Sequence, residues 1–169
     1  MIRYIIIAFI IISITSRAYA QEVRLGLMHH DIAKDCNHRR EKGQNISAEI
    51  IFDDFDKILY AYWHVGVTAN NQDYTSSAYT GLSWRINLIK EIFIELTFGG
   101  AVNNGKSRST ARKKKAIGSN LLFRESISIG AIFKEVHTVS IILEHMSNAD
   151  FGSCNPGFTD LGVRYGYKF

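Results

Sequence analysis

Two residues near the end of the chain, His145 and Ser147, are spaced for nucleophilic catalysis. They stand two apart in the run Glu144-His145-Met146-Ser147-Asn148. On a β-strand, side chains two positions apart share a face, with Cα atoms about 6.5–7 Å apart. An imidazole can lean across that gap and take the hydroxyl proton, which a serine nucleophile requires. The spacing alone does not separate this chemistry from an ordinary polar pair at a strand end.

The chain that must position this pair alternates between apolar and polar residues. Val139, Ile141 and Leu143 share a face with His145 and Ser147, so the pair continues an apolar stripe. Eight segments of strand length show such a pattern, namely 23–29, 47–53, 59–68, 79–88, 92–99, 121–133, 139–147 and 161–169. An even number of alternating segments near ten residues long predicts an all-β fold, an eight-stranded antiparallel transmembrane β-barrel of the outer membrane.

The faces opposite the apolar stripes carry charges of both signs, interleaved with Gly, Ser and Thr. These charged residues are Arg24, Glu49, Arg85, Glu95, Arg124, Glu144 and Arg164. Mixed charges suit a narrow lumen filled by ion pairs, which leaves the apolar stripes to face lipid. The sixth segment is less regular, because Glu125 falls on its apolar face. A soluble ligand-binding barrel, with its apolar face inward, is the alternative architecture.

The start of the chain resembles an export signal. Residues 1–20 carry Arg3, the apolar run Tyr4–Ile12 and the small-residue pattern Ala18-Tyr19-Ala20, as a secretory signal peptide does. We therefore expect one domain, a barrel over residues 21–169, in the outer membrane of a Gram-negative bacterium. Export permits a disulfide between Cys36 and Cys154, which lie in loops beside the seam where the first and last strands meet.

The connections between the segments alternate in length. Short ones follow the second, fourth and sixth segments, and long ones follow the first, third, fifth and seventh. Long loops lie outside in such barrels, so strand direction puts His145 and Ser147 at the outer end, facing lipid. A substrate in that leaflet would be lipopolysaccharide. One long loop is dense in cations, which indicates either a solvated loop or attraction to lipopolysaccharide phosphates: Lys106, Arg108, Arg112, Lys113, Lys114 and Lys115.

The last part of the chain resembles the lipid A 3-O-deacylase (PagL) family. The resemblance rests on His145-Met146-Ser147-Asn148-Ala149, on Asn155-Pro156-Gly157 and on the closing segment 161–169. It implies an eight-stranded outer-membrane barrel that removes the 3-linked acyl chain of lipid A without a metal or cofactor. It also implies Ser147 as nucleophile and His145 as general base. Asn148 and Asn155, with backbone amides near Ala149 and Asp150, would then stabilise the oxyanion.

The chain departs from the family at the third member of the triad. The resemblance implies an acid at the position of Thr159, and the nearest carboxylate is Asp160, one residue later. Strand parity turns Asp160 toward the lumen unless a bulge re-aims it. We predict that Asp160 orients His145, the alternative being a degraded triad. Parity also turns Glu144 inward, where we expect an ion pair with Arg124 or Arg164.

Other classes of function have less support. A non-enzymatic outer-membrane barrel, structural or surface-binding, shares every feature except the His-Ser pair and the Asn155 loop. His29, His30 and His38 could suggest a metal site, but adjacent His29 and His30 point to opposite faces of a strand. The net charge of +4 suits an anionic membrane surface, and no nucleic-acid module is present. Lipid A and outer-membrane lipid are the expected partners, and a homodimer stays open.

Overall fold

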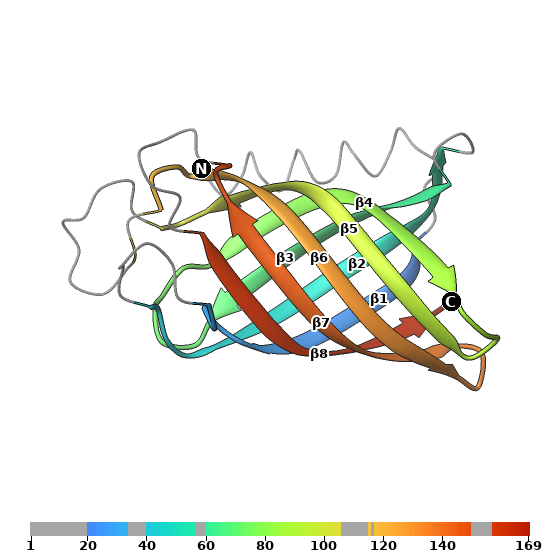
Figure 1. The fold of residues 1–169 in the computed structure, drawn as a ribbon. Coiled ribbons are helices and arrows are strands. Elements are labelled where there is room, and N and C mark those ends of the chain that lie inside the picture. The colour runs from blue at the N-terminus through green and yellow to red at the C-terminus, as the bar shows by residue number, and fades with distance from the viewer. Residues whose placement is uncertain (1–19, 34–39, 57–59, 106–114, 116, 150–156) are drawn as a thin grey trace.

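The computed structural model describes residues 20–33, 40–56, 60–105, 115, 117–149 and 157–169. In these residues eight antiparallel strands form a closed barrel, in which consecutive strands pair and β8 pairs with β1 (Figure 1). The strands are β1 (Ala20–His29), β2 (Gln44–Asp56), β3 (Ala61–Asn70), β4 (Ser77–Asn87), β5 (Ile92–Asn103), β6 (Leu121–Phe133), β7 (His137–Ser147) and β8 (Phe158–Lys168). The predicted fold class is confirmed. No helix within the described residues is long and apolar enough to cross a membrane.

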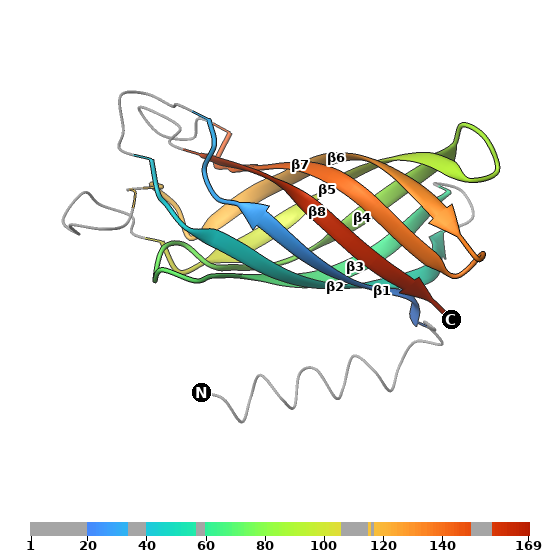
Figure 2. The same cartoon turned by 90° about the horizontal axis from the view of Figure 1, so that it is seen from below.

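The barrel has two unlike ends, seen at opposite sides of Figures 1 and 2. The loop end carries the connections 30–43, 71–76, 104–120 and 148–157. The turn end carries the connections 57–60, 88–91 and 134–136, together with Phe169 at the end of the chain. The predicted alternation of long and short connections is therefore confirmed. Cys36, Cys154 and residues 1–19 of the predicted signal peptide (residues 1–20) lie outside the described residues, whereas Ala20 is the first residue of β1.

One strand boundary decides the placement of a predicted site residue. β8 begins at Phe158 rather than at Leu161, so Thr159 and Asp160 belong to the strand. β7 pairs with β8 in an unbroken register from His137↔Tyr167 to Met146↔Phe158. Because no bulge interrupts this register, strict alternation holds up to the loop end.

The alternation separates an apolar outer wall from a charged interior. Large outward side chains are exposed, among them Leu25, Ile46, Ile129 and Val163. Inward side chains such as Arg24 are buried although they carry charge. This polarity is the reverse of that of a soluble barrel, so the soluble alternative is wrong.

Ion pairs fill the lumen. Arg24 contacts Glu22 at 3.0 Å, Glu49 at 3.0 Å and Glu95 at 2.6 Å, through side chains that are almost wholly buried. Arg164 reaches Glu49 at 3.0 Å and Glu95 at 3.2 Å. Because Glu49 and Glu95 each contact both arginines, these ion pairs form one network. Each buried charge is thereby paired with an opposite charge in a lumen that holds little water.

A second lumen pair lies nearer the loop end. The Nε atom of Arg124 donates to Glu144 Oε2 at 2.8 Å, which confirms one of the two predicted partners of Glu144. The Arg124 guanidinium also stacks on the Tyr79 ring, 3.8 Å from its centroid. Glu144 is therefore held inside the barrel by its own counter-charge.

Arg24→Met should lower the free energy of unfolding by roughly 3–5 kcal/mol, because it leaves buried carboxylates without their cation. The control is Leu25→Met on the outer wall, which should cost less than about 1.5 kcal/mol. Urea unfolding in lipid vesicles, followed by tryptophan fluorescence, measures both. A value for Arg24→Met within about 0.5 kcal/mol of the unsubstituted protein would contradict the dependence of the fold on this network.

Candidate active site

His145 and Ser147 lie on the outer wall near the loop end of β7, as predicted. Both side chains are half-buried. The cross-strand partner of Ser147 is Phe123 on β6. The side chains of His145 and Ser147 both lie close to Gly157. A Cβ added at Gly157 would lie 2.9 Å from Ser147 Cβ and 3.0 Å from His145 Cε1. The two predicted catalytic residues therefore share one outward-facing site.

The residue that contacts His145 from β8 is Thr159. These two residues are cross-strand partners, and His145 Nδ1 lies 2.8 Å from Thr159 Oγ1. When Nδ1–H donates to that hydroxyl, Nε2 is the unprotonated nitrogen and can act as a base. Thr159 thus occupies the orienting position that the family resemblance gives to an acid.

The prediction that Asp160 orients His145 is wrong, because Asp160 faces the lumen and is fully buried. Its Oδ1 atom lies 2.8 Å from His30 Nδ1 and accepts the Asp31 backbone N–H at 2.9 Å. Its Oδ2 atom accepts a hydrogen bond from Asn45 Nδ2 at 2.6 Å. The unbroken register of β8 turns consecutive residues to opposite sides of the wall, so Thr159 faces out and Asp160 faces in.

An apolar groove on the outer wall borders His145. Its volume is about 610 Å³, and it crosses β4 to β8. One row, which includes Phe98 and Glu125, lies level with His145. The second row lies one step nearer the turn end and consists of the apolar residues Trp84, Leu96, Ile127 and Leu143. The lining consists of Trp84, Leu96, Thr97, Phe98, Glu125, Ser126, Ile127, Leu143, His145 and Thr159. A hydrocarbon chain could therefore lie beside the Ser147–His145 pair.

The predicted oxyanion residues are placed only in part. The side chain of Asn148 is buried and donates to the Ile117 carbonyl at 3.2 Å. Ala149 has a φ of 53°, in the left-handed region that non-glycine residues seldom adopt and that recurs at functional sites. Asn155 and Asp150 lie outside the described residues.

A buried polar group, which we term the mouth cluster, joins the first long connection to β8 at the loop end. It consists of His30, Asp31, Glu41, Lys115 and Asp160. Both ring nitrogens of His30 contact carboxylates, Asp160 at 2.8 Å and Glu41 at 2.9 Å. Burial opposes the charged imidazolium, but the hydrogen bonds to Asp160 and Glu41 outweigh it and raise the pKa of His30 to about 9.

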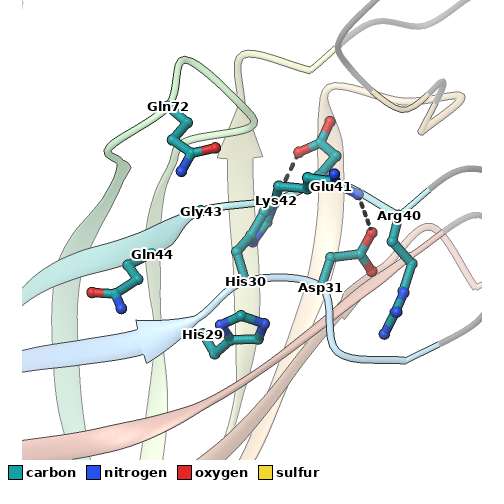
Figure 3. A pocket seen from close by; sticks show the side chains of 9 residues that line it. All are labelled: His29, His30, Asp31, Arg40, Glu41, Lys42, Gly43, Gln44 and Gln72. Atoms are coloured by element: carbon teal, nitrogen blue, oxygen red, sulfur yellow. Dashed lines mark hydrogen bonds and ion pairs between the residues drawn. The ribbon is translucent and has the colours of Figure 1, made fainter.

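Figure 3 shows His30 pointing toward Glu41, whose backbone N–H donates to Asp31 at 2.8 Å. These residues border a polar cavity of about 460 Å³, which His29, Arg40 and other residues of this end complete. His30 is buried whereas His29 is exposed, and β1 ends at His29, so the strand does not continue through the pair. His38 lies outside the described residues.

The mouth cluster extends to the outward-facing site through two hydrogen bonds. Lys115 Nζ contacts Asp31 at 3.2 Å and donates to the Gly157 carbonyl at 2.7 Å. The Ile32 N–H donates to the Thr159 carbonyl at 2.7 Å. Lys115 is therefore buried and paired, which fits neither of the two alternatives for that loop, solvation or attraction to lipopolysaccharide phosphates. The other predicted cations of that loop, 106–114, lie outside the described residues.

Comparison with known families agrees with this geometry. The sequence profile of the family described as "Lipid A 3-O-deacylase (PagL)" matches residues 43–168, which is most of the chain. The chain belongs to this family. It is accordingly a hydrolase that acts on an ester of lipid A, the lipid part of lipopolysaccharide, and it resides in the outer membrane. No curated protein sequence matches it.

Solved structures support the fold of this PagL family member. The crystal structure of the outer membrane enzyme PagL superposes with a TM-score of 0.65 at 19% identity, covering 88% of this chain and 99% of that one. Neisserial surface protein A gives a TM-score of 0.64 at 10% identity, covering 91% and 100%. A de novo designed transmembrane β-barrel gives 0.55 at 9% identity, covering 89% and 98%. At these identities the likeness concerns the barrel alone.

Sequence reasoning missed the mouth cluster and the neighbours of His145. The sequence did indicate that Glu125 is unusual, because its carboxylate interrupts an otherwise apolar face. Counting residues back from the turn between β6 and β7 would have placed it opposite His145. The contacts of His30 with Glu41 and Asp160 had no comparable signal, since they join distant segments across a loop.

Gly157→Ala should reduce deacylation by about 10- to 100-fold if His145 and Ser147 carry the reaction, because the added methyl displaces both side chains. It would meet Met146 O at 2.6 Å as well as Ser147 and His145. The matched control is Gly100→Ala, whose Cβ meets nothing nearer than Leu122 O at 3.9 Å. Release of fatty acid from lipopolysaccharide measures both variants. Full activity of Gly157→Ala would show that the two side chains need not hold these positions.

The barrel should lose stability between about pH 6.5 and pH 9. The pKa of His30 is about 9 when folded, against 6.5 as the ordinary value. The stability that the protonated His30 contributes to the folded barrel is therefore complete below pH 6.5 and is lost as the pH rises through 9. His30→Gln should remove this part of the pH dependence. Thermal unfolding in detergent at a series of pH values compares the two proteins, and identical slopes would contradict the assignment to His30.

Proposed function

We propose that this PagL family member removes the 3-linked acyl chain of lipid A as a serine esterase, with Ser147 as nucleophile and His145 as general base. The observation that carries the proposal is the position of both side chains on the outer wall beside Gly157, with His145 lining the apolar groove. An embedded lipid could reach such a site without leaving the membrane.

The reaction follows from the chemistry of this pair. Ser147 Oγ attacks the ester carbonyl carbon while its proton passes to His145 Nε2. The tetrahedral intermediate then breaks the bond to the sugar oxygen, which takes the proton from His145. Water, deprotonated in turn by His145, hydrolyses the acyl-enzyme and releases the fatty acid. Thr159 fixes the required tautomer through its contact with Nδ1.

The groove offers a place for the acyl chain. Leu143 and Ile127 form a cross-strand pair one step nearer the turn end than His145, and Leu96 and Trp84 continue this row. A chain whose ester meets Ser147 would extend along that row, deeper into the membrane. Moving the acyl chain from water into this groove stabilises the bound substrate by at most about 0.8 kcal/mol per CH₂ group. The net gain is smaller, because the surrounding lipid already shields the chain from water.

The developing oxyanion needs donors next to Ser147. We assign this task to Asn148, Asn155 and the backbone amides near Ala149 and Asp150, as the family resemblance implies.

The loop end faces outward in this proposal. Barrels of this class have short periplasmic turns and longer outer loops, and the described connections divide in that way. His145 and Ser147 then lie level with the outer leaflet, where lipopolysaccharide resides.

Ser147→Ala and His145→Ala should each lower the rate of deacylation at least about 1,000-fold, because each removes a reacting group. The double variant should lose little more, since the two groups act as a unit. His137→Ala, a histidine at the other end of β7, is the matched control and should keep full activity. Mass spectrometry of lipid A from cells that express each variant gives the readout.

Heat-modifiable migration in gels should show that all of these variants are folded, because the side chains lie outside the lumen network. A folded Ser147→Ala protein that still removes the 3-linked chain would overturn the serine mechanism.

A further inference from the structure

Glu125 is a carboxylate on a face that otherwise meets lipid. The outward neighbours of Glu125 on β6 are Phe123 and Ile127, and both are exposed and apolar. An ionisable group on the lipid face of a barrel is unfavourable, although less so near an interface and less for Glu than for Lys or Arg. An ionisable residue in such a place indicates a function.

The register places this carboxylate directly beside His145. Glu125 is the cross-strand partner of His145 on β6, and Thr159 is its partner on β8. Directly opposed residues have Cβ atoms about 4.5–5.5 Å apart and point to the same side. All three residues line the same groove, so His145 has a hydroxyl on one flank and a carboxylate on the other.

The two flanks supply different things to the imidazole. Thr159 Oγ1, 2.8 Å from Nδ1, can fix the tautomer but carries no charge. A general base that accepts a proton becomes an imidazolium, and a nearby negative charge stabilises it. In an apolar groove this attraction is stronger than in water, because the effective dielectric constant is lower.

The other carboxylates near this part of β7 are turned away. Glu144 faces the lumen and pairs with Arg124. Asp160 faces the lumen and pairs with His30. Leu143 and Ser147, the outward neighbours of His145 on its own strand, carry no charge. Among the described carboxylates around His145, Glu125 is therefore the one that lies on the same side of the wall.

We infer that Glu125 supplies the negative charge that stabilises the His145 imidazolium, while Thr159 fixes its tautomer. The two tasks that one acid performs in a serine triad are divided here between β6 and β8. Glu125 is a positioning and electrostatic residue that acts through His145. The inference rests on the proposed serine mechanism.

Glu125→Gln keeps the shape of the side chain and removes its charge. We expect kcat for lipopolysaccharide in detergent micelles to fall about tenfold or more with KM nearly unchanged. Thr159→Val is the matched comparison, because it keeps the shape of the side chain and removes the hydroxyl that contacts His145 Nδ1, and it should also lower kcat.

A second set of variants tests whether a carboxylate placed near His145 restores the activity. Glu125→Asp should retain part of the activity, and Thr159→Glu added to Glu125→Gln should restore most of the lost kcat by supplying a carboxylate from β8. A Glu125→Gln protein with unchanged kcat would overturn the inference. So would a loss confined to KM, which would make Glu125 a substrate contact, or a double variant that is not rescued.

Ser147→Ala in the same assay keeps the two proposals apart. If Ser147→Ala is inactive while Glu125→Gln behaves as the unsubstituted enzyme, the role of Glu125 fails and the serine mechanism stands. If Ser147→Ala is active, the serine mechanism itself fails. Heat-modifiable migration confirms that each variant is folded before its kinetics are compared.

Discussion

The unbroken pairing of β7 with β6 and β8 is the constraint on which the site depends. Because side chains alternate strictly along these strands, each residue of β7 is committed to one side of a wall a single strand layer thick. His145 and Ser147 meet lipid, whereas Glu144 and Met146 between and beside them are buried inside. The same rule selects Thr159 and Glu125 as neighbours of His145 and excludes Asp160.

The two sides of the wall solve opposite problems. The lumen must compensate charges such as Arg24 and Glu95 without bulk water, and it does so by sharing carboxylates among several guanidinium groups. The outer wall must be apolar to remain in the membrane, so every polar group there needs a partner or a task. Thr159 has His145 as its partner, and the task of Glu125 follows from its place next to the same imidazole.

Local pattern was enough to predict most of the fold and part of the site. Alternation identified eight strands, the apolar wall, the charged lumen and the shared face of His145 and Ser147, because each depends on residues close in sequence. The choice of Asp160 was wrong because the start of β8 was placed three residues late, where a loop could have re-aimed the side chain. Glu125 was noticed as an irregularity, but its meaning required the register between two strands. The contacts of His30 with Glu41 and Asp160 required three-dimensional structure, since no periodicity links these positions.

Thr159 lies between its contact with His145 on one side and a backbone hydrogen bond to Ile32 on the other, so the proposed mechanism makes activity depend on assembly. Its hydroxyl reaches His145 only when β8 pairs with β7, and its carbonyl receives the Ile32 N–H only when β8 also meets the segment after β1. A chain whose strands have not yet paired lacks both contacts. In the proposed mechanism hydrolytic competence is therefore tied to barrel closure, and so to the membrane that holds the substrate.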